Sequence, residues 1–194
     1  MFQPTNTRRL SIGTLNVNRL CRDEQLVGLQ EELQGINIDV LALTELRWKG
    51  EGALDLNDSG FRFYHAGPED GQDVSGTGFF VSSRVQPFVE SFRRVSPRIS
   101  VLDLKYGRQL LRLFAVYAPP TSSTRSVRSS EDNDAEEEDE EEEYEGCLET
   151  IRRELRTVRM PGWERGSGGA GRDAIVQLRV YPVLLGDFNA KIGR

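Results

Sequence analysis

The sequence has few of the residues that build disulfide frameworks or histidine-rich metal centres. Its 194 residues include two cysteines, Cys21 and Cys147, and one histidine, His65. Two distant cysteines without an N-terminal apolar segment argue against a disulfide framework and against secretion, and they favour a reducing compartment. We therefore expect an intracellular protein, nuclear or cytoplasmic. A single histidine in a strand is most often structural, and we assign His65 no role.

Long hydrophobic runs are also missing. No apolar stretch approaches the roughly 18 residues needed to cross a bilayer, so we expect no transmembrane segment and no membrane partner. The Gly-rich stretch at residues 161–172 lacks the following Lys-Ser/Thr and helix of a phosphate-binding loop. We interpret this stretch as a link. No internal repeat is present.

Positive charge is absent from one segment and abundant elsewhere. Residues 131–145 contain 12 Asp or Glu and no Lys or Arg. Removing these 12 negative charges changes the formal net charge from −6 to +6, so the rest of the chain is basic. A basic body is compatible with nucleic acid, and the acidic run with basic proteins. We treat residues 121–145 as an acidic low-complexity insertion.

The length suits one domain, and the first part of the chain predicts a strand–helix–strand unit. Residues 9–16 alternate as a strand does, and residues 25–33 carry leucines at helical spacing between an N-cap at Asp23 and a stop at Gly35. The apolar run at 38–43 indicates a strand buried on both faces. Further short strands are predicted at residues 61–65, 78–82, 88–95, 99–104, 110–117 and 181–185. We expect an α/β layered domain with mostly antiparallel sheets and a tight turn at 106–108.

A second helix is predicted after the acidic run. Apolar residues recur there at alternating steps of four and three, which is the stripe of an amphipathic helix. These residues are Tyr144, Leu148, Ile151, Leu155 and Val158. We interpret the acidic run as a frayed extension of this helix.

Four predicted strands end in side chains that can carry chemistry. The ends present Asn16, Glu45, Tyr117 and, after the last strand, Asp187 with Asn189. If these strands are neighbours, their ends converge on one rim, where sites form in layered α/β domains. Such a set suits Mg²⁺, with Mn²⁺ as a second candidate. The alternatives are an Asx turn at Asp187 to Asn189 and ordinary turn or core roles for Asn16 and Tyr117.

Five short motifs occur in the order seen in the endonuclease/exonuclease/phosphatase superfamily. The sequence most resembles the branch of non-LTR retrotransposon endonucleases and the craniofacial development protein 2-like proteins. This resemblance implies a four-layered α/β sandwich and Mg²⁺-dependent cleavage of phosphodiesters, with DNA as the expected substrate. The motifs are Thr14-Leu15-Asn16-Val17-Asn18, Thr44-Glu45-Leu46-Arg47-Trp48, Gly76-Thr77-Gly78-Phe79, Val116-Tyr117-Ala118-Pro119 and Gly186-Asp187-Phe188-Asn189-Ala190.

The resemblance also implies a role for each candidate residue. Glu45 would be the main metal ligand, and Asn16 would help to orient metal and phosphate. Asp187 would position or deprotonate the attacking water, and Asn189 would hydrogen-bond the phosphate. Tyr117 would contact the phosphate or the transition state. These roles suit the reaction, because phosphodiester cleavage needs an activated water and compensation for growing negative charge.

Two neighbouring residues are weaker candidates for substrate binding. Arg47 and Trp48 could hold nucleic acid by charge and stacking, and the alternative is a buried Trp beside a surface Arg. A Ca²⁺ loop at residues 55–60 is excluded because Ala66 occupies the position that needs Glu, so we predict a turn there.

The superfamily pattern continues past the last motif with further strands and an Asp-His pair that this sequence does not contain. We therefore interpret residues 1–194 as the N-terminal part of one such domain, with an incomplete fold and an open strand edge. Our first hypothesis is a Mg²⁺-dependent hydrolase of the retroelement DNA endonuclease type, weak or inactive as this chain alone. The second is a non-enzymatic remnant that acts as an interaction module through its acidic helix or basic body.

Overall fold

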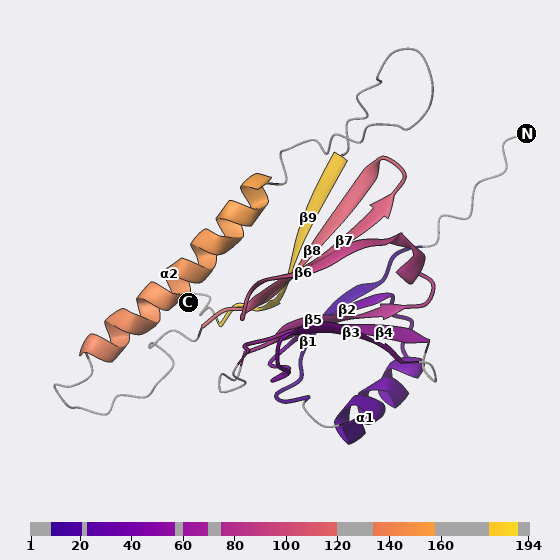
Figure 1. Cartoon of the computed structure of the whole chain (residues 1–194), viewed down its shortest axis with the longest axis horizontal. Helices are drawn as coiled ribbons and strands as arrows, with labels where there is room; N and C mark the ends of the chain where they lie inside the picture. The colour runs from indigo at the N-terminus through magenta and orange to yellow at the C-terminus, as the bar shows by residue number, and fades with distance from the viewer. Residues whose placement is uncertain are drawn as a thin grey trace, which may run out of the picture.

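Two stacked β-sheets with a helix on each outer face form the molecule (Figure 1). The structure is a computed structural model and describes residues 9–20, 23–56, 60–69, 75–119, 134–157 and 179–189. The predicted Gly-rich link, the first part of the acidic insertion, Val158 and Cys21 lie outside these residues.

The first sheet contains the predicted strand–helix–strand unit. Its strand order is β1-β2-β5-β4-β3, with β1 parallel to β2 and the other pairs antiparallel. Helix α1 (Asp23–Gln34) connects β1 and β2. Leu26 and Leu33 of this helix pack against Leu41 and Leu43 of β2. The strands are β1 (Ile12–Asn16), β2 (Val40–Thr44), β3 (Glu51–Leu56), β4 (Phe61–Ala66) and β5 (Thr77–Ser82).

The second sheet has the order β6-β7-β8-β9. A tight turn with Gly107 at φ 61° joins β7 and β8, as the sequence predicted. Strand β9 pairs in parallel with β8 and lies at the edge of the sheet. The elements are η1 (Gln86–Phe88), β6 (Val89–Ser96), β7 (Ile99–Tyr106), β8 (Gln109–Tyr117) and β9 (Arg179–Asp187).

Side-chain alternation along the strands separates the layers. On β2, Leu41 and Leu43 face α1, whereas Val40 and Ala42 pack between the two sheets. A third cluster lies between the second sheet and helix α2 (Asp134–Thr157) and includes Phe114 of β8. Because successive strand residues point to opposite faces, each central strand contributes to two cores. The predicted four-layered α/β sandwich is confirmed.

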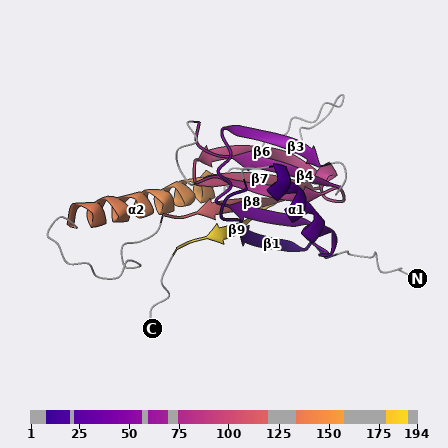
Figure 2. The same ribbon diagram turned by 90° about the horizontal axis from the view of Figure 1, so that it is seen from below.

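Helix α2 packs on the second sheet through Tyr144, Ile151 and Leu155 of the predicted stripe, with Cys147 in the place expected for Leu148. Cys147 and Ile151 are buried, with Tyr144 and Leu155 partly buried beside them. The helix begins at Asp134, so it takes in much of the acidic run. Its first half extends past the edge of the sheets (Figure 2). Neither described helix is long and apolar enough to cross a membrane.

Strand β3 was not predicted from the sequence. It holds Glu51, Gly52, Ala53 and Asp55, which are poor strand formers. Most of its residues are exposed, because β3 lies at a sheet edge and pairs only with β4. Asp55, which we placed at the start of a turn, lies within this strand, and residues 57–59 are outside the described part.

Candidate active site

Four loops meet where an edge strand of one sheet lies beside an edge strand of the other. Asn16 ends β1 beside Thr44, the last residue of β2, and Tyr117 ends β8 beside Asp187, the last residue of β9. Strands β1 and β9 are the neighbouring edges of the two sheets. The predicted convergence of strand ends on one rim is therefore present.

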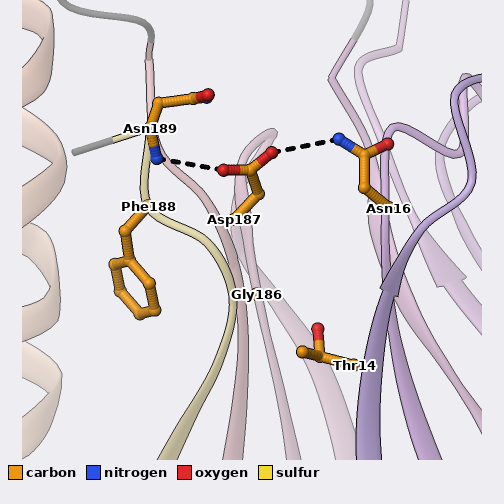
Figure 3. A pocket seen from close by; sticks show the side chains of 6 residues that line it. All are labelled: Thr14, Asn16, Gly186, Asp187, Phe188 and Asn189. Atoms are coloured by element: carbon orange, nitrogen blue, oxygen red, sulfur yellow. Dashed lines mark hydrogen bonds between the residues drawn. The ribbon is translucent and has the colours of Figure 1, made fainter. Parts of the chain in front are cut away.

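The side-chain amide of Asn16 joins two carboxylates. Its Nδ2 donates to Glu45 Oε1 at 2.7 Å. The same nitrogen donates to Asp187 Oδ2 at 3.1 Å, the bond drawn in Figure 3. The backbone N–H of Asn18 donates to Asn16 Oδ1 at 3.0 Å. That bond fixes the orientation of the amide, so both N–H groups point at the carboxylates. Residues far apart in the sequence thus form one polar cluster.

Asp187 is held on its other side by an Asx turn. Its Oδ1 accepts the backbone N–H of Asn189 at 3.0 Å, as Figure 3 shows. Asn189 Nδ2 donates to the carbonyl oxygen of Ala118 at 2.7 Å. The Asx turn that we considered as an alternative to a site is therefore present within the cluster. It turns the other oxygen of Asp187 toward Asn16.

Tyr117 completes the cluster from the second sheet. Tyr117 is 8% exposed, and its hydroxyl hydrogen-bonds Glu45. Burial raises the pKa of Tyr117, and the negative charge of Glu45 and this hydrogen bond raise it further. The phenol therefore keeps its proton near neutral pH and serves as a hydrogen-bond donor.

The backbone around the cluster is strained. Five non-glycine residues in the described part of the chain have positive φ, and all lie in these loops. Such conformations are costly for residues with a Cβ and concentrate at functional sites. They are Asn18 (41°), Arg19 (85°), Glu45 (59°), Arg47 (57°) and Asn189 (46°).

An open hollow of about 350 Å³ lies over Asn16 and Asp187. Thr14, Gly186, Phe188 and Asn189 complete its lining, and Figure 3 shows the Phe188 ring pointing away from Asn16 and Asp187. The side chain of Phe188 also packs against the cluster beneath α2. The hollow thus presents amide and carboxylate groups to solvent above a hydrophobic support.

The donor set fits a hard cation with few protein ligands. Within the described ranges, no group of three or more His, Cys, Asp or Glu side chains gathers that could hold a metal. Glu45 and Asp187 make no ion pair with any residue the structure describes. Mg²⁺ is usually bound by one or two carboxylates together with waters and substrate phosphates. Two carboxylates and an amide at an open hollow meet that requirement.

A family model described as the Endonuclease/Exonuclease/phosphatase family matches residues 13–192. The chain belongs to the endonuclease/exonuclease/phosphatase family. The match includes the loops after β1, β2, β8 and β9, so the site lies within the family domain.

Curated relatives cover part of the chain. Craniofacial development protein 2 of Tragulus javanicus is 31% identical over 108 residues, which is 56% of this chain and 18% of the relative. The protein of the same name from Bos taurus is 30% identical over 108 residues, with the same shares of the two chains covered. The chain spans less than a fifth of the length of these relatives.

The chain is also similar to two solved structures. A humanized D. rerio TDP2 has a TM-score of 0.47 and 16% identity, over 94% of this chain and 67% of that one. An endonuclease/exonuclease/phosphatase family protein from Leptotrichia buccalis has a TM-score of 0.47 and 14% identity, over 93% and 67% of the two chains.

The two weaker candidates, Arg47 and Trp48, take different positions in this family domain. The indole N–H of Trp48 donates to the carbonyl oxygen of Leu20, and its ring meets Phe63 edge-on at 5.1 Å between centroids. These contacts favour the alternative of a buried Trp. Arg47 is half-buried, and its Nε has no hydrogen-bond partner among the described residues.

His65 lies in the core beside Trp48. It is 9% exposed, and the centroids of the two rings are 4.8 Å apart. Burial lowers the pKa of His65, with the charge of Glu51 opposing the shift. The neutral imidazole therefore packs as a core residue, in keeping with the absence of an assigned role.

Sequence reasoning missed Arg98, which reaches the cluster from the turn between β6 and β7. Its guanidinium carbon is 5.3 Å from the centroid of the Tyr117 ring. Pro97 and Arg98 lie between the strands predicted at residues 88–95 and 99–104, and nothing in the sequence pattern connects Arg98 with Tyr117. Asn18 was also missed, although the Asn-x-Asn spacing after β1 suggests a side chain capped by a backbone N–H.

Proposed function

We propose that this rim is the active site of a Mg²⁺-dependent phosphodiesterase that acts on nucleic acid. One observation carries the proposal: the Asn16 amide joins Glu45 and Asp187, and the described residues supply no cation to neutralise these carboxylates. Two neighbouring carboxylates at an open hollow are a ligand set that Mg²⁺ commonly uses together with waters and phosphate oxygens. Membership of the family supports the same reaction class.

Glu45 and Asn16 are the proposed metal-holding residues, with Mg²⁺ preferred and Mn²⁺ as an alternative. When bound, the ion supplies Lewis-acid polarisation and compensates the negative charge of a phosphodiester. In the structure Asn16 turns its NH₂ group toward the two carboxylates and its Oδ1 toward the N–H of Asn18, so ligation of the ion through Oδ1 requires the amide to turn over.

The other three residues, Asp187, Asn189 and Tyr117, are proposed to act on the attacking water and on the phosphate. Asp187 has one oxygen held by Asn189 and the other turned to Asn16, so it is placed to orient or deprotonate a water in the hollow. Asn189 uses one of its two side-chain N–H groups on Ala118 and keeps the second for a phosphate oxygen. The protonated phenol of Tyr117 donates its single proton to Glu45. In the proposed reaction this proton is given to a phosphate oxygen instead, once an ion binds Glu45.

DNA is the proposed substrate, and a retroelement-type endonuclease the proposed ancestry. Outside residues 131–145 the formal charge of the chain is positive, and polyanion binding depends on such charge. Arg47 is the better candidate for a DNA contact, because Trp48 packs into the core.

A nicking assay tests the proposal. The purified chain is incubated at high concentration with supercoiled plasmid and Mg²⁺ or Mn²⁺. We expect slow nicking, reduced at least about a hundredfold by Glu45→Gln or Asp187→Asn, since losing one preorganised group costs about that much. Glu51→Gln, an acidic residue of β3, is the matched control and keeps the wild-type rate. Metal-dependent nicking that is equal in all four proteins would contradict the proposal.

The expected slowness is a separate prediction. It follows from the lack of a second histidine in the sequence, because His65 is buried in the core. Nicking as fast as that of an efficient endonuclease would contradict the weak activity and leave the site assignment intact.

An interaction module is the second candidate, favoured by the acidic first half of α2 that extends past the sheets (Figure 2). Under this alternative, a basic protein partner binds α2 and the metal residues have no effect. Binding of a Lys-rich peptide that is unchanged by Glu45→Gln, together with no nicking, would support it over the enzyme.

A further inference from the structure

Arg98 connects helix α2 to the candidate active site. Its carbonyl oxygen accepts the backbone N–H of Tyr117 at 2.9 Å, and its own N–H donates to Ser96 Oγ at 3.2 Å. The backbone of Arg98 is thus fixed against the end of β8, next to the phenol.

The guanidinium of Arg98 lies between a ring and a carboxylate. Its carbon is 5.3 Å from the centroid of the Tyr117 ring, inside the range of a cation–π contact. Nε donates to Glu143 Oε1 of α2 at 2.9 Å. Nη1 is buried and has no hydrogen-bond partner among the described residues. With its side chain 16% exposed, the arginine is enclosed beside the ring.

Arg98 borders a hollow, so its few contacts determine the position of its side chain. A hollow of about 310 Å³ lies between the turn and α2, lined by Pro97, Arg98, Glu143 and Cys147 among others. A side chain bordered by empty space keeps its place only if specific contacts hold it there. The bond to Glu143 and the contact with Tyr117 are the contacts available.

We infer that Arg98 is a positioning residue for the phosphodiesterase reaction. Held by Glu143, it fixes the ring of Tyr117 so that the hydroxyl meets Glu45 and the substrate phosphate. The catalytic meaning of this inference rests on the proposed function. It gives one residue of the acidic run, Glu143, a role at the site.

Nuclear magnetic resonance on protein with ¹³C-labelled tyrosine rings tests the positioning step without metal or substrate. Tyr117→Phe identifies the Tyr117 resonance. We expect Arg98→Met to shift and broaden this resonance, and Glu143→Gln to shift it in the same direction by less. Arg152→Met is the matched control, because Arg152 is an exposed arginine of α2 paired with Glu149. An unchanged Tyr117 resonance in Arg98→Met would overturn the inference.

A double-mutant cycle tests whether Arg98 acts through Tyr117. The affinity for a short DNA duplex is measured with Mn²⁺ by fluorescence anisotropy. Arg98→Met weakens binding about tenfold in the wild-type background and leaves it unchanged in the Tyr117→Phe background. Arg98→Lys, which keeps the charge, gives an intermediate loss. Equal weakening in both backgrounds would overturn the inference, because Arg98 would then act directly on DNA or on stability.

The two measurements also separate this inference from the proposed function. If Glu45→Gln leaves Mn²⁺-dependent DNA binding unchanged, the proposed function fails. The nuclear magnetic resonance result then still decides whether Arg98 positions the Tyr117 ring.

Discussion

The two ends of strand β2 carry carboxylates with opposite environments. Asp39, just before the strand, is 3% exposed and pairs with Arg84. It also accepts the backbone N–H of Ser11 at 2.8 Å and the hydroxyl of Ser82 at 3.4 Å. Glu45, just after the strand, is held by the Asn16 amide and the Tyr117 hydroxyl, with no ion pair in the described part of the chain.

The difference distinguishes a structural carboxylate from a candidate catalytic one. Asp39 has donors on both oxygens, so its charge is fully used inside the fold. Glu45 and Asp187 are bound by neutral donors, whereas Asp39 is paired with the Arg84 cation. No residue that the structure describes supplies a cation to the two site carboxylates, so their charge is left for a bound ion. Local sequence does not reveal this difference, because both residues border the same apolar strand.

The largest expected effect on stability comes from Gly186 at the site rim, and Gly107, in the turn at the other end of β8, is its comparison. At Gly186 φ is 140°, and an added Cβ would lie 1.8 Å from the carbonyl oxygen of Val116. We expect Gly186→Ala to lower the free energy of unfolding by about 4 kcal/mol, because both the conformation and the contact are unfavourable. Gly107 of the opposite rim has φ 61° and open space, so Gly107→Ala costs about 1 kcal/mol. Urea unfolding measures both, and equal losses would show that the site rim is not tightly constrained.

The second prediction contrasts the carboxylates themselves. Asp39→Asn places an NH₂ group against donors in either amide orientation, so we expect a loss of about 3 kcal/mol in the free energy of unfolding. Glu45→Gln removes a charge close to Asp187 and changes stability by less than about 1 kcal/mol without metal. Matched losses in urea unfolding would contradict the distinction between the two ends of β2.

The third prediction concerns the core beneath the site loop. The pKa of His65 is lower in the folded protein than its usual 6.5, so the unfolded chain binds the proton more tightly. Stability is therefore full above pH 6.5 and falls as the pH drops below it, by at most about 1.4 kcal/mol per pH unit. Urea unfolding at pH 7.5, 6.5 and 5.5 measures this. The variant His65→Gln should be less stable than the wild type at all three pH values, but should lose less stability between pH 7.5 and pH 5.5. An identical pH dependence in the two proteins would exclude His65 as the source of the wild-type loss.

Much of the fold followed from local patterns, and the finer parts of the site did not. The apolar run of β2 and the stripe of α2 predicted two of the layers, because burial imposes periodicity on the sequence. Strand β3 was not predicted, because an exposed edge strand needs few hydrophobic residues and so leaves little periodic pattern in the sequence. The placement of Trp48 in the core depends on contacts with Leu20 and Phe63 that no local pattern encodes.

The site shows the same division. Strand ends predicted Asn16, Glu45 and Asp187 as candidates, but the bond between Asn16 and Asp187 joins residues 171 positions apart. Arg98 depends on tertiary structure in the same way, since its partners lie on β8 and α2. Sequence therefore predicts which residues are available, and packing decides which of them meet.

Metal binding tests the central claim most directly. Thermal unfolding is followed while Mn²⁺ or Mg²⁺ is titrated into the wild-type protein, Glu45→Gln, Asp187→Asn and Asp39→Asn. At about five times the dissociation constant, the ion should stabilise the wild type by about 1 kcal/mol and raise its Tm by about 2–4 °C. The shift should vanish in Glu45→Gln and Asp187→Asn and persist in Asp39→Asn. A shift that survives in all variants, or none in the wild type, would contradict a metal site at this rim.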